Sequence, residues 1–177
     1  NGHSFGKTSI SADGRYIAFQ SSASNLVPND TNGWGDVFVH DRQTGETTRL
    51  SIDSNGNQGN NSSSSSSSSI SADGKYVAFS SSASNLVPND INGTTDIFVH
   101  DCETGGTTRV SVDSNGNQGN SFSNFPSMSA DGRYVAFTSN TSNLVSNDTN
   151  GKLDVFVHDR ETGGTTRVSV DSNGNQG

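Results

Sequence analysis

Short apolar segments separated by polar turns recur three times along the chain. The pattern is clearest in residues 11–53, where residues 15–19 and 36–40 are rich in Val, Ile, Phe and Tyr. Nearly the same stretch returns at residues 71–113 and 129–171. Five-residue segments of this kind, bounded by Gly, Asn and Asp, are typical of β-strands. Their repetition predicts a series of similar units that bury surface on one another.

Each repeat is predicted to contain four strands and no helix. In the first repeat a weak, polar strand ends at residues 9–11, and the fourth strand covers residues 47–52. Asp13 and Gly14 are expected to form a tight turn before the second strand, because Asp accepts hydrogen bonds from its own backbone and Gly adopts positive φ. A long polar loop, residues 21–35, separates the second strand from the third.

Four antiparallel strands per repeat, with apolar residues on both faces of the central strands, predict an all-β protein made of β-propeller blades. The blades are expected to cover residues 1–59, 60–119 and 120–177 within one repeat domain. Closed propellers contain about four to eight blades. Three four-stranded antiparallel repeats therefore predict half of a six-bladed ring or part of a larger array.

The joint between the first two repeats contains an unbroken run of serines, residues 62–69. Serine-rich composition is typical of flexible linkers. The register of the repeat, however, places the end of the run in the first strand of the second repeat. We therefore expect the run to be half linker and half strand.

The chain is acidic, with a formal net charge of −8 from 18 acidic and 10 basic residues. This balance opposes binding to nucleic acid or to an anionic membrane surface, because both require clustered Lys and Arg. It is compatible with cation binding. No apolar run approaches the ~20 residues that a membrane-spanning helix needs, so we expect no membrane insertion. The chain begins at Asn1 and ends on the Asn-Gln-Gly that closes each repeat, which predicts a piece of something longer cut at a repeat boundary.

Cys102 is the only cysteine, so no disulfide can form within the chain. It stands where the other repeats have Arg42 and Arg160. We interpret it as a surface position in a turn that has drifted from arginine.

The segments SADGRYIAF, DVFVHD, TG and TTRLS follow one another in a fixed order, and together they resemble the WD-like propeller repeat typified by the periplasmic protein TolB. The usual Ser-Pro-Asp-Gly turn of that family is Ser-Ala-Asp-Gly in all three repeats here. The resemblance covers nearly the whole chain. It implies a blade fold, an exported location (extracellular or periplasmic) and no catalytic residue. The long loop between the second and third strands and the number of repeats depart from the family pattern.

The loop before the third strand carries oxygen-bearing side chains around a glycine. In the first repeat these are Asp30, Asn32 and Asp36, with Gly33 between them. Oxygen ligands with this spacing suit a hard cation such as Ca²⁺, and the pattern is similar to the calcium loops of integrin-type propellers and EF-hands. Asp and Asn-Gly also form ordinary turns, so the spacing fits both readings equally. The candidate metal ligands are Asp30, Asn32, Asp36, Asp90, Asn92, Asp96, Asp148, Asn150 and Asp154.

Other polar motifs give weaker indications of a metal site or a catalytic site. The alternately spaced Asp53, Asn55 and Asn57 include one carboxylate and are predicted to form a plain turn. The sequence contains one Gly-x-Ser-x-Gly pattern, residues 2–6, but no helix is predicted to follow it, as a nucleophile elbow requires. The few glutamates lie in or beside predicted hairpin turns, so we expect no enzyme activity. A histidine ends each third strand, without the spacing of paired metal ligands. We expect these histidines to form structural hydrogen bonds, such as one to a neighbouring blade: His40, His100 and His158.

Together these features predict an extracellular structural or interaction module, stabilised by calcium, that assembles with copies of itself or with the remainder of a longer repeat chain into a ring or a filament-like array. One alternative is a propeller that captures a glycan or peptide in its central funnel, although only Trp34 offers a loop-tip aromatic ring for this purpose. Another is the non-catalytic propeller domain of an exported hydrolase. Glycans could be attached at several Asn-x-Ser/Thr sequons if the protein is exported: Asn29, Asn61, Asn92, Asn140 and Asn147.

Overall fold

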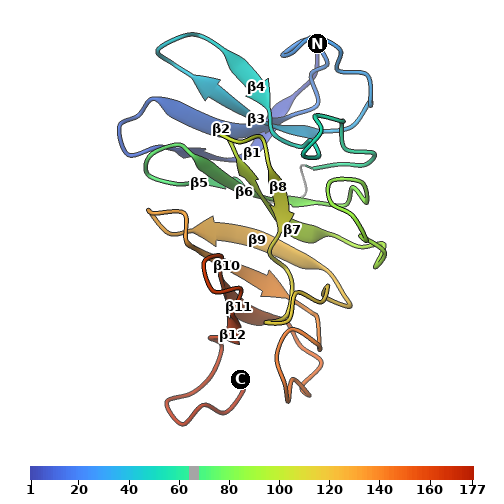
Figure 1. Cartoon of the computed structure of the whole chain (residues 1–177), viewed down its shortest axis with the longest axis vertical. Coiled ribbons are helices and arrows are strands. Elements are labelled where there is room, and N and C mark those ends of the chain that lie inside the picture. The colour runs from blue at the N-terminus through green and yellow to red at the C-terminus, as the bar shows by residue number, and fades with distance from the viewer. Residues whose placement is uncertain (64–67) are drawn as a thin grey trace.

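The structure, a computed structural model, describes residues 1–63 and 68–177. Within these residues it contains twelve β-strands, and it contains no helix that is long and apolar enough to cross a membrane. The strands form three four-stranded sheets, and each sheet consists of consecutive strands from one repeat. Figure 1 shows the sheets following one another along the long axis, with the two termini at opposite ends. The predicted all-β architecture of three four-stranded repeats is confirmed.

All neighbouring strands within each sheet are antiparallel. The first sheet contains β1 (Ser4–Ile10), β2 (Tyr16–Ser21), β3 (Asp36–Asp41) and β4 (Thr47–Arg49). The second contains β5 (Ser68–Ile70), β6 (Tyr76–Ser81), β7 (Asp96–Asp101) and β8 (Thr107–Arg109). The third contains β9 (Ser123–Met128), β10 (Tyr134–Ser139), β11 (Asp154–Asp159) and β12 (Thr165–Arg167).

The predicted Asp-Gly turn forms as the sequence indicates. The Asp13 carboxylate accepts hydrogen bonds from the Ser11 hydroxyl at 2.6 Å and from the Arg15 amide at 2.9 Å. Gly14 follows with φ of 73°, in the region that glycine adopts without steric cost. The same contacts recur in the other two repeats. This turn therefore fixes how β1 leads into β2.

The fourth strand is shorter than the sequence predicts, because it ends at Arg49 rather than at residue 52. The Leu50 amide still donates to the Val37 carbonyl at 2.8 Å. At the next residue the Ser51 hydroxyl takes over from the main chain and accepts the hydrogen bond of the Val37 amide at 3.2 Å. A serine side chain that bonds to the backbone in this way competes with the regular ladder.

Two apolar clusters fill the spaces between successive sheets. In the second sheet Val77 and Phe79 belong to the cluster shared with the first sheet, whereas Ala78 belongs to the cluster shared with the third. This alternation follows from the two-residue period of a strand. We call the face of a sheet that points to the preceding repeat its leading face, and the face that points to the following repeat its trailing face. Leu86 and Leu144, from the long loops, also lie buried in these clusters.

The end of the serine run lies in a strand, as the repeat register predicts. Ser68 and Ser69 belong to β5, and Ser69 pairs with Ala78 of β6. Ser63 is buried, and its amide donates to the Gly35 carbonyl of the preceding repeat at 2.8 Å. The linker half of the prediction falls on residues 64–67, which lie outside the described residues.

Candidate functional site

The predicted metal ligands of the first repeat come together, but they do so around an arginine side chain. Arg49 Nη1 lies 3.0 Å from Asp30 Oδ1 and 3.5 Å from Asp36 Oδ2. Asn32 donates from its side-chain nitrogen to Asp36 at 3.1 Å, so that its amide turns nitrogen, not oxygen, toward the carboxylate. The positive charge that faces these two carboxylates is therefore supplied by the chain.

The same arrangement recurs in the other two repeats. Arg109 Nη1 lies 3.2 Å from Asp90 and 3.9 Å from Asp96. Arg167 Nη1 lies at the same two distances from Asp148 and Asp154. Asn92 and Asn150 donate to the second aspartate of their own loops, as Asn32 does.

The second aspartate of each loop is deeply buried. Asp96 is inaccessible to solvent and accepts hydrogen bonds from the Ser111 hydroxyl at 2.5 Å and from Asn92 at 2.9 Å. Burial raises the pKa of Asp36 and of Asp96 above the ordinary carboxyl value, and the hydrogen bonds from Ser51 and Ser111 oppose this shift. Each loop thus combines desolvated carboxylates with a single compensating guanidinium.

A calcium ion at these loops would have to compete with the guanidinium. Two carboxylates and one arginine leave each cluster with a charge of −1, which still favours a cation. Within residues 1–63 and 68–177, however, no three side chains of His, Cys, Asp or Glu converge as a metal-binding group. Calcium binding here stays a prediction. The arginines were not among the predicted site residues, although Thr-Thr-Arg recurs in every repeat together with the aspartates.

The loop after the fourth strand forms an ordinary turn. Asp53 Oδ1 accepts hydrogen bonds from the amides of Asn55 and Asn57, both at 2.8 Å. Asp53 Oδ2 accepts one from the Asn57 side chain at 2.8 Å. These bonds within the turn hold the pKa of Asp53 below its usual value, against a raising effect of burial that is the largest single influence. The carboxylate closes the turn by itself.

In the second and third repeats, the histidine of the third strand is connected to the preceding sheet through a threonine. His100 Nδ1 lies 2.9 Å from the Thr107 hydroxyl, which in turn donates to the Ile52 carbonyl of the preceding repeat at 2.6 Å. Because that hydroxyl has one proton, it accepts from His100, and the imidazole carries its hydrogen on Nδ1. Burial lowers the pKa of His100. The predicted hydrogen bond to a neighbouring repeat is therefore indirect.

Each joint between sheets places a tyrosine ring on a glycine. A Cβ atom at Gly74 would lie 2.2 Å from Tyr16 Cδ2, and one at Gly132 would lie 2.4 Å from Tyr76 Cδ2. Such distances are far below van der Waals contact, so only glycine fits beneath the ring. Gly132 also receives a hydrogen bond on its carbonyl from Arg160 Nη1 at 2.6 Å. The second joint is therefore a Tyr–Gly–Arg contact that links consecutive repeats.

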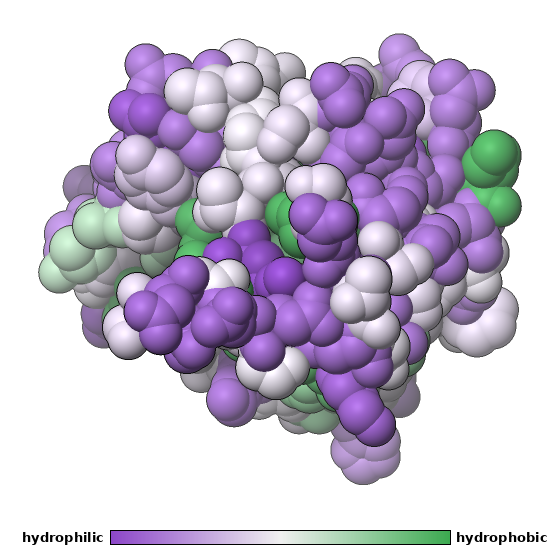
Figure 2. Space-filling model, turned by 90° about the horizontal axis from the view of Figure 1, so that it is seen from below, coloured by the Kyte–Doolittle hydropathy of each residue, from purple (hydrophilic) through white to green (hydrophobic). Residues whose placement is uncertain are grey.

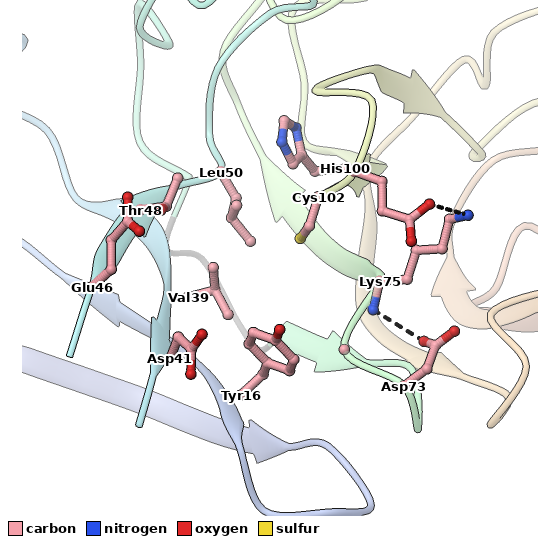
Figure 3. Close-up of a pocket in the computed structure, with 12 residues that line it drawn as sticks. Tyr16, Val39, Asp41, Glu46, Thr48, Leu50, Asp73, Lys75, His100 and Cys102 are labelled. Atoms are coloured by element: carbon pink, nitrogen blue, oxygen red, sulfur yellow. Dashed lines mark hydrogen bonds and ion pairs between the residues drawn. The ribbon is translucent and has the colours of Figure 1, made fainter. Parts of the chain in front are cut away.

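A groove opens at the joint of the first two sheets, with a volume of about 300 Å³. Figure 3 shows Tyr16, Val39 and Leu50 on the side of the first sheet, and His100 and Cys102 on the side of the second. Cys102 belongs to an exposed turn, but its thiol points into the groove, where burial raises its pKa to about 12. Its neutral side chain lines a space between repeats.

Comparison with known proteins gives matches among solved structures. No protein-family model matches the chain, and no curated protein matches it by sequence. TolB from Acinetobacter baumannii is 23% identical, with a TM-score of 0.59, over 92% of this chain and 32% of its own length. A putative TolB from Agrobacterium tumefaciens is 16% identical, with a TM-score of 0.55, over 94% of this chain and 48% of its own. The β-propeller domain of the trilobed protease from Pyrococcus furiosus is 12% identical, with a TM-score of 0.55, over 93% of this chain and 41% of its own.

The chain folds as three blades of a TolB-type β-propeller. It spans less than half the length of each of these three structures. At such identities the likeness concerns the fold, and the predicted blade architecture is confirmed.

The two end blades each leave one face uncovered. At the trailing face of blade 3, Val155 is 36% exposed and Val168 is 48% exposed. Their counterparts in blade 2, Ile97 and Val110, are 0% and 2% exposed because blade 3 covers them. Figure 2, which views the molecule from below and so toward this end, shows small apolar patches between hydrophilic side chains.

Proposed function

We propose that the chain is an exported, non-catalytic structural or interaction module whose end faces pair with those of a second copy. The observation that carries this proposal is the exposure of Val155 and Val168 at positions that are buried wherever another blade follows. Two copies together would have six blades, within the about four to eight of closed propellers. The pairing would be head to tail, so it would repeat the contact already made between blades of one chain.

The polar chemistry of the two end faces is complementary. At the leading face of blade 1, Arg42 Nη1 donates to the Gly14 carbonyl at 3.0 Å, the bond that Arg160 makes to Gly132. At the trailing face of blade 3, Tyr134 is 41% exposed. Pairing would place Tyr134 of one copy on Gly14 and Arg42 of the other. Within one chain, Tyr76 of blade 2 lies in the same way on Gly132 and Arg160 of blade 3.

The likeness to TolB supports an exported location, which is part of the proposal, as is stabilisation by calcium at the aspartate loops. In support of calcium, two carboxylates converge in each loop with one guanidinium. The comparison favours one further candidate, because the trilobed protease of Pyrococcus furiosus carries a propeller domain of similar fold. This chain would then be the non-catalytic propeller part of an exported hydrolase.

Sedimentation velocity over a range of concentrations tests the pairing. We expect the wild-type chain to form a two-chain particle, and we expect Val155→Asp to be monomeric because it places a charge in the paired face. Ile91→Asp is the matched control, since Ile91 is an apolar residue exposed in a loop rather than on an end face. A wild-type chain that stays monomeric at high micromolar concentration contradicts the proposal and favours coverage of the end face by another domain. Equal association of both variants also contradicts it.

A further inference from the structure

The groove at the first joint contains a cysteine where the second joint has an arginine, and the cavities at the two joints differ more in their lining residues than in volume, about 300 Å³ and about 290 Å³. The Cys102 amide donates to the Lys75 carbonyl at 2.8 Å, and the Arg160 amide donates to the Arg133 carbonyl at 3.0 Å. The two residues therefore occupy the same backbone position in blades 2 and 3. The difference between the joints lies in their side chains.

At the second joint the arginine side chain covers the tyrosine. Arg160 Cζ lies 4.1 Å from the centroid of the Tyr76 ring, and Nη1 donates to the Gly132 carbonyl. A guanidinium over an aromatic face is attracted by the ring quadrupole. The cysteine at the first joint is too short to make either contact, so the corresponding space next to Tyr16 and Gly74 becomes the groove shown in Figure 3.

The lining residues show that the groove at the first joint reaches deeper between the sheets than the cavity at the second joint. Val39, Leu50 and His100 line the groove at the first joint. Their counterparts at the second joint do not line the cavity found there, whose lining is Tyr76, Asp131, Gly132, Arg133, Arg160 and Glu161. Arg160 thus lies between the cavity of its own joint and the apolar residues beneath it. At the first joint the groove reaches those residues, although Val39 and Leu50 are still only 8% and 1% exposed.

The walls of the groove are acidic. Among the lining residues are four carboxylates and one lysine. Lys75 pairs with Glu103 at 2.6 Å, and Asp41 pairs with Arg15, which lies outside the lining, at 2.7 Å. Asp73 and Glu46 add two more negative charges. The Arg15 guanidinium also lies 4.8 Å from the Tyr16 ring. At the second joint, Lys75 lies 5.4 Å from the Tyr76 ring, and Arg160 still stacks on that ring. A neighbouring cation therefore does not prevent a guanidinium from stacking on the tyrosine.

We propose that this groove binds a guanidinium group, such as the arginine side chain of a peptide. The guanidinium would stack on Tyr16 and donate to the Gly74 carbonyl, in the place that Arg160 fills at the second joint. The acidic walls favour a cation over a neutral group of the same shape. The site lies between two blades of one chain, so it does not depend on pairing with a second copy.

Isothermal titration calorimetry with N-acetyl-arginine amide tests the site. The neutral N-acetyl-citrulline amide, which has nearly the same shape, serves as the control ligand. We expect one equivalent of the arginine probe to bind the wild-type chain, at least tenfold more tightly than the citrulline probe. Cys102→Arg should lower the affinity at least tenfold, because the new side chain occupies the groove. Cys102→Ser should keep the wild-type affinity, because serine leaves the space open.

The reciprocal variant gives a second, independent test. Arg160→Cys removes the covering side chain at the second joint, and we expect it to bind two equivalents of the arginine probe. Unchanged affinity in Cys102→Arg, or equal binding of the arginine and citrulline probes, would overturn the proposal. A folded Arg160→Cys variant, judged by its circular dichroism spectrum, that still binds a single equivalent would also contradict it.

Discussion

Arg160 of blade 3 stacks on Tyr76 of blade 2, with its guanidinium carbon 4.1 Å from the ring centroid. The equivalent positions differ at the two joints and at the two ends of the chain. The contact is complete at the second joint, and at the first joint Cys102 leaves it without its guanidinium. At the two ends its halves are separated, since Arg42 lies on the leading face and Tyr134 on the trailing face. The second joint, the groove at the first joint and the two end faces therefore all contain the same repeat positions, with the tyrosine–arginine contact complete only at the second joint.

The close approach of tyrosine to glycine makes Gly132 sensitive to any side chain. Gly132→Ala combines a positive φ of 72° with a Cβ placed 2.4 Å from the Tyr76 ring. We expect it to lower the free energy of unfolding by about 2–4 kcal/mol in urea denaturation, since both strain and overpacking contribute. Gly163→Ala is the matched control, with φ of 75° and open space around the new Cβ. It should cost only about 1 kcal/mol. Equal losses in the two variants would contradict the packing role of Gly132.

The buried aspartate of each loop is predicted to be essential to its blade. Asp96→Ala leaves Arg109 without one of its carboxylates and removes the acceptor of the Ser111 and Asn92 hydrogen bonds. Breaking a buried pair from one side costs about 3–5 kcal/mol. Chemical denaturation should show this loss, with a smaller one for Asp96→Asn, which keeps an acceptor oxygen. An Asp96→Ala variant as stable as the wild type would disprove the role assigned to this cluster.

The buried histidines predict a loss of stability in mild acid. Burial lowers the pKa of His100 and His158 in the folded state below the ordinary value of 6.5. The unfolded chain therefore takes up these protons first, and the stability that they contribute is present above pH 6.5 and lost as the pH falls through the lower folded values.

His100→Asn keeps a side-chain donor for Thr107 but removes one of these titrations. We expect its deficit in unfolding free energy relative to the wild type to shrink between pH 7.5 and pH 5 in paired denaturation curves. His3→Asn is the control, because His3 is exposed near the N-terminus. A deficit for His100→Asn that is constant with pH would refute the linkage.

If calcium binds at the aspartate loops, it must compete with the arginine of each loop, and this competition can be tested. Arg49 faces Asp30 and Asp36, so a calcium ion at this loop must displace its guanidinium. We expect CaCl₂ to raise the melting temperature of the chain and EGTA to lower it, with a larger calcium effect in Arg49→Met than in the wild type. Arg15→Met, which breaks a pair with Asp41 away from the loop, is the control. No calcium-dependent shift in either the wild type or Arg49→Met would remove the ion from the account.

Most of the blade architecture could be predicted from sequence because it depends on local patterns. The Asp-Gly turn and the apolar second and third strands carry their signals within a few residues. Arg49 could not be assigned in the same way, because it lies on an outer strand 19 positions after Asp30 and looks like an ordinary exposed residue. Only the fold brings it to the aspartates.

The role of Cys102 also could not be predicted from the sequence of a single repeat. In sequence it replaces an arginine in a polar turn, and a drifted surface position is the simplest interpretation. The partner that gives this position meaning, the tyrosine of the preceding blade, lies in a different repeat. Contacts between repeats can be recognised only when the blades are placed next to each other.

Disulfide cross-linking tests the pairing of end faces most directly. The Ala12 amide donates to the Ala72 carbonyl and the Ala72 amide to the Ala130 carbonyl, both at 2.8 Å, so these alanines mark the same point on successive blades. Head-to-tail pairing would bring Ala130 of one copy to Ala12 of the other. An Ala12→Cys, Ala130→Cys variant in a Cys102→Ser background should therefore oxidise to a covalent two-chain species on a non-reducing gel. The control pair, Ala12→Cys with Ala72→Cys, should oxidise within one chain. Persistence of the first variant as a monomer with two free thiols, while the control oxidises, would contradict the account.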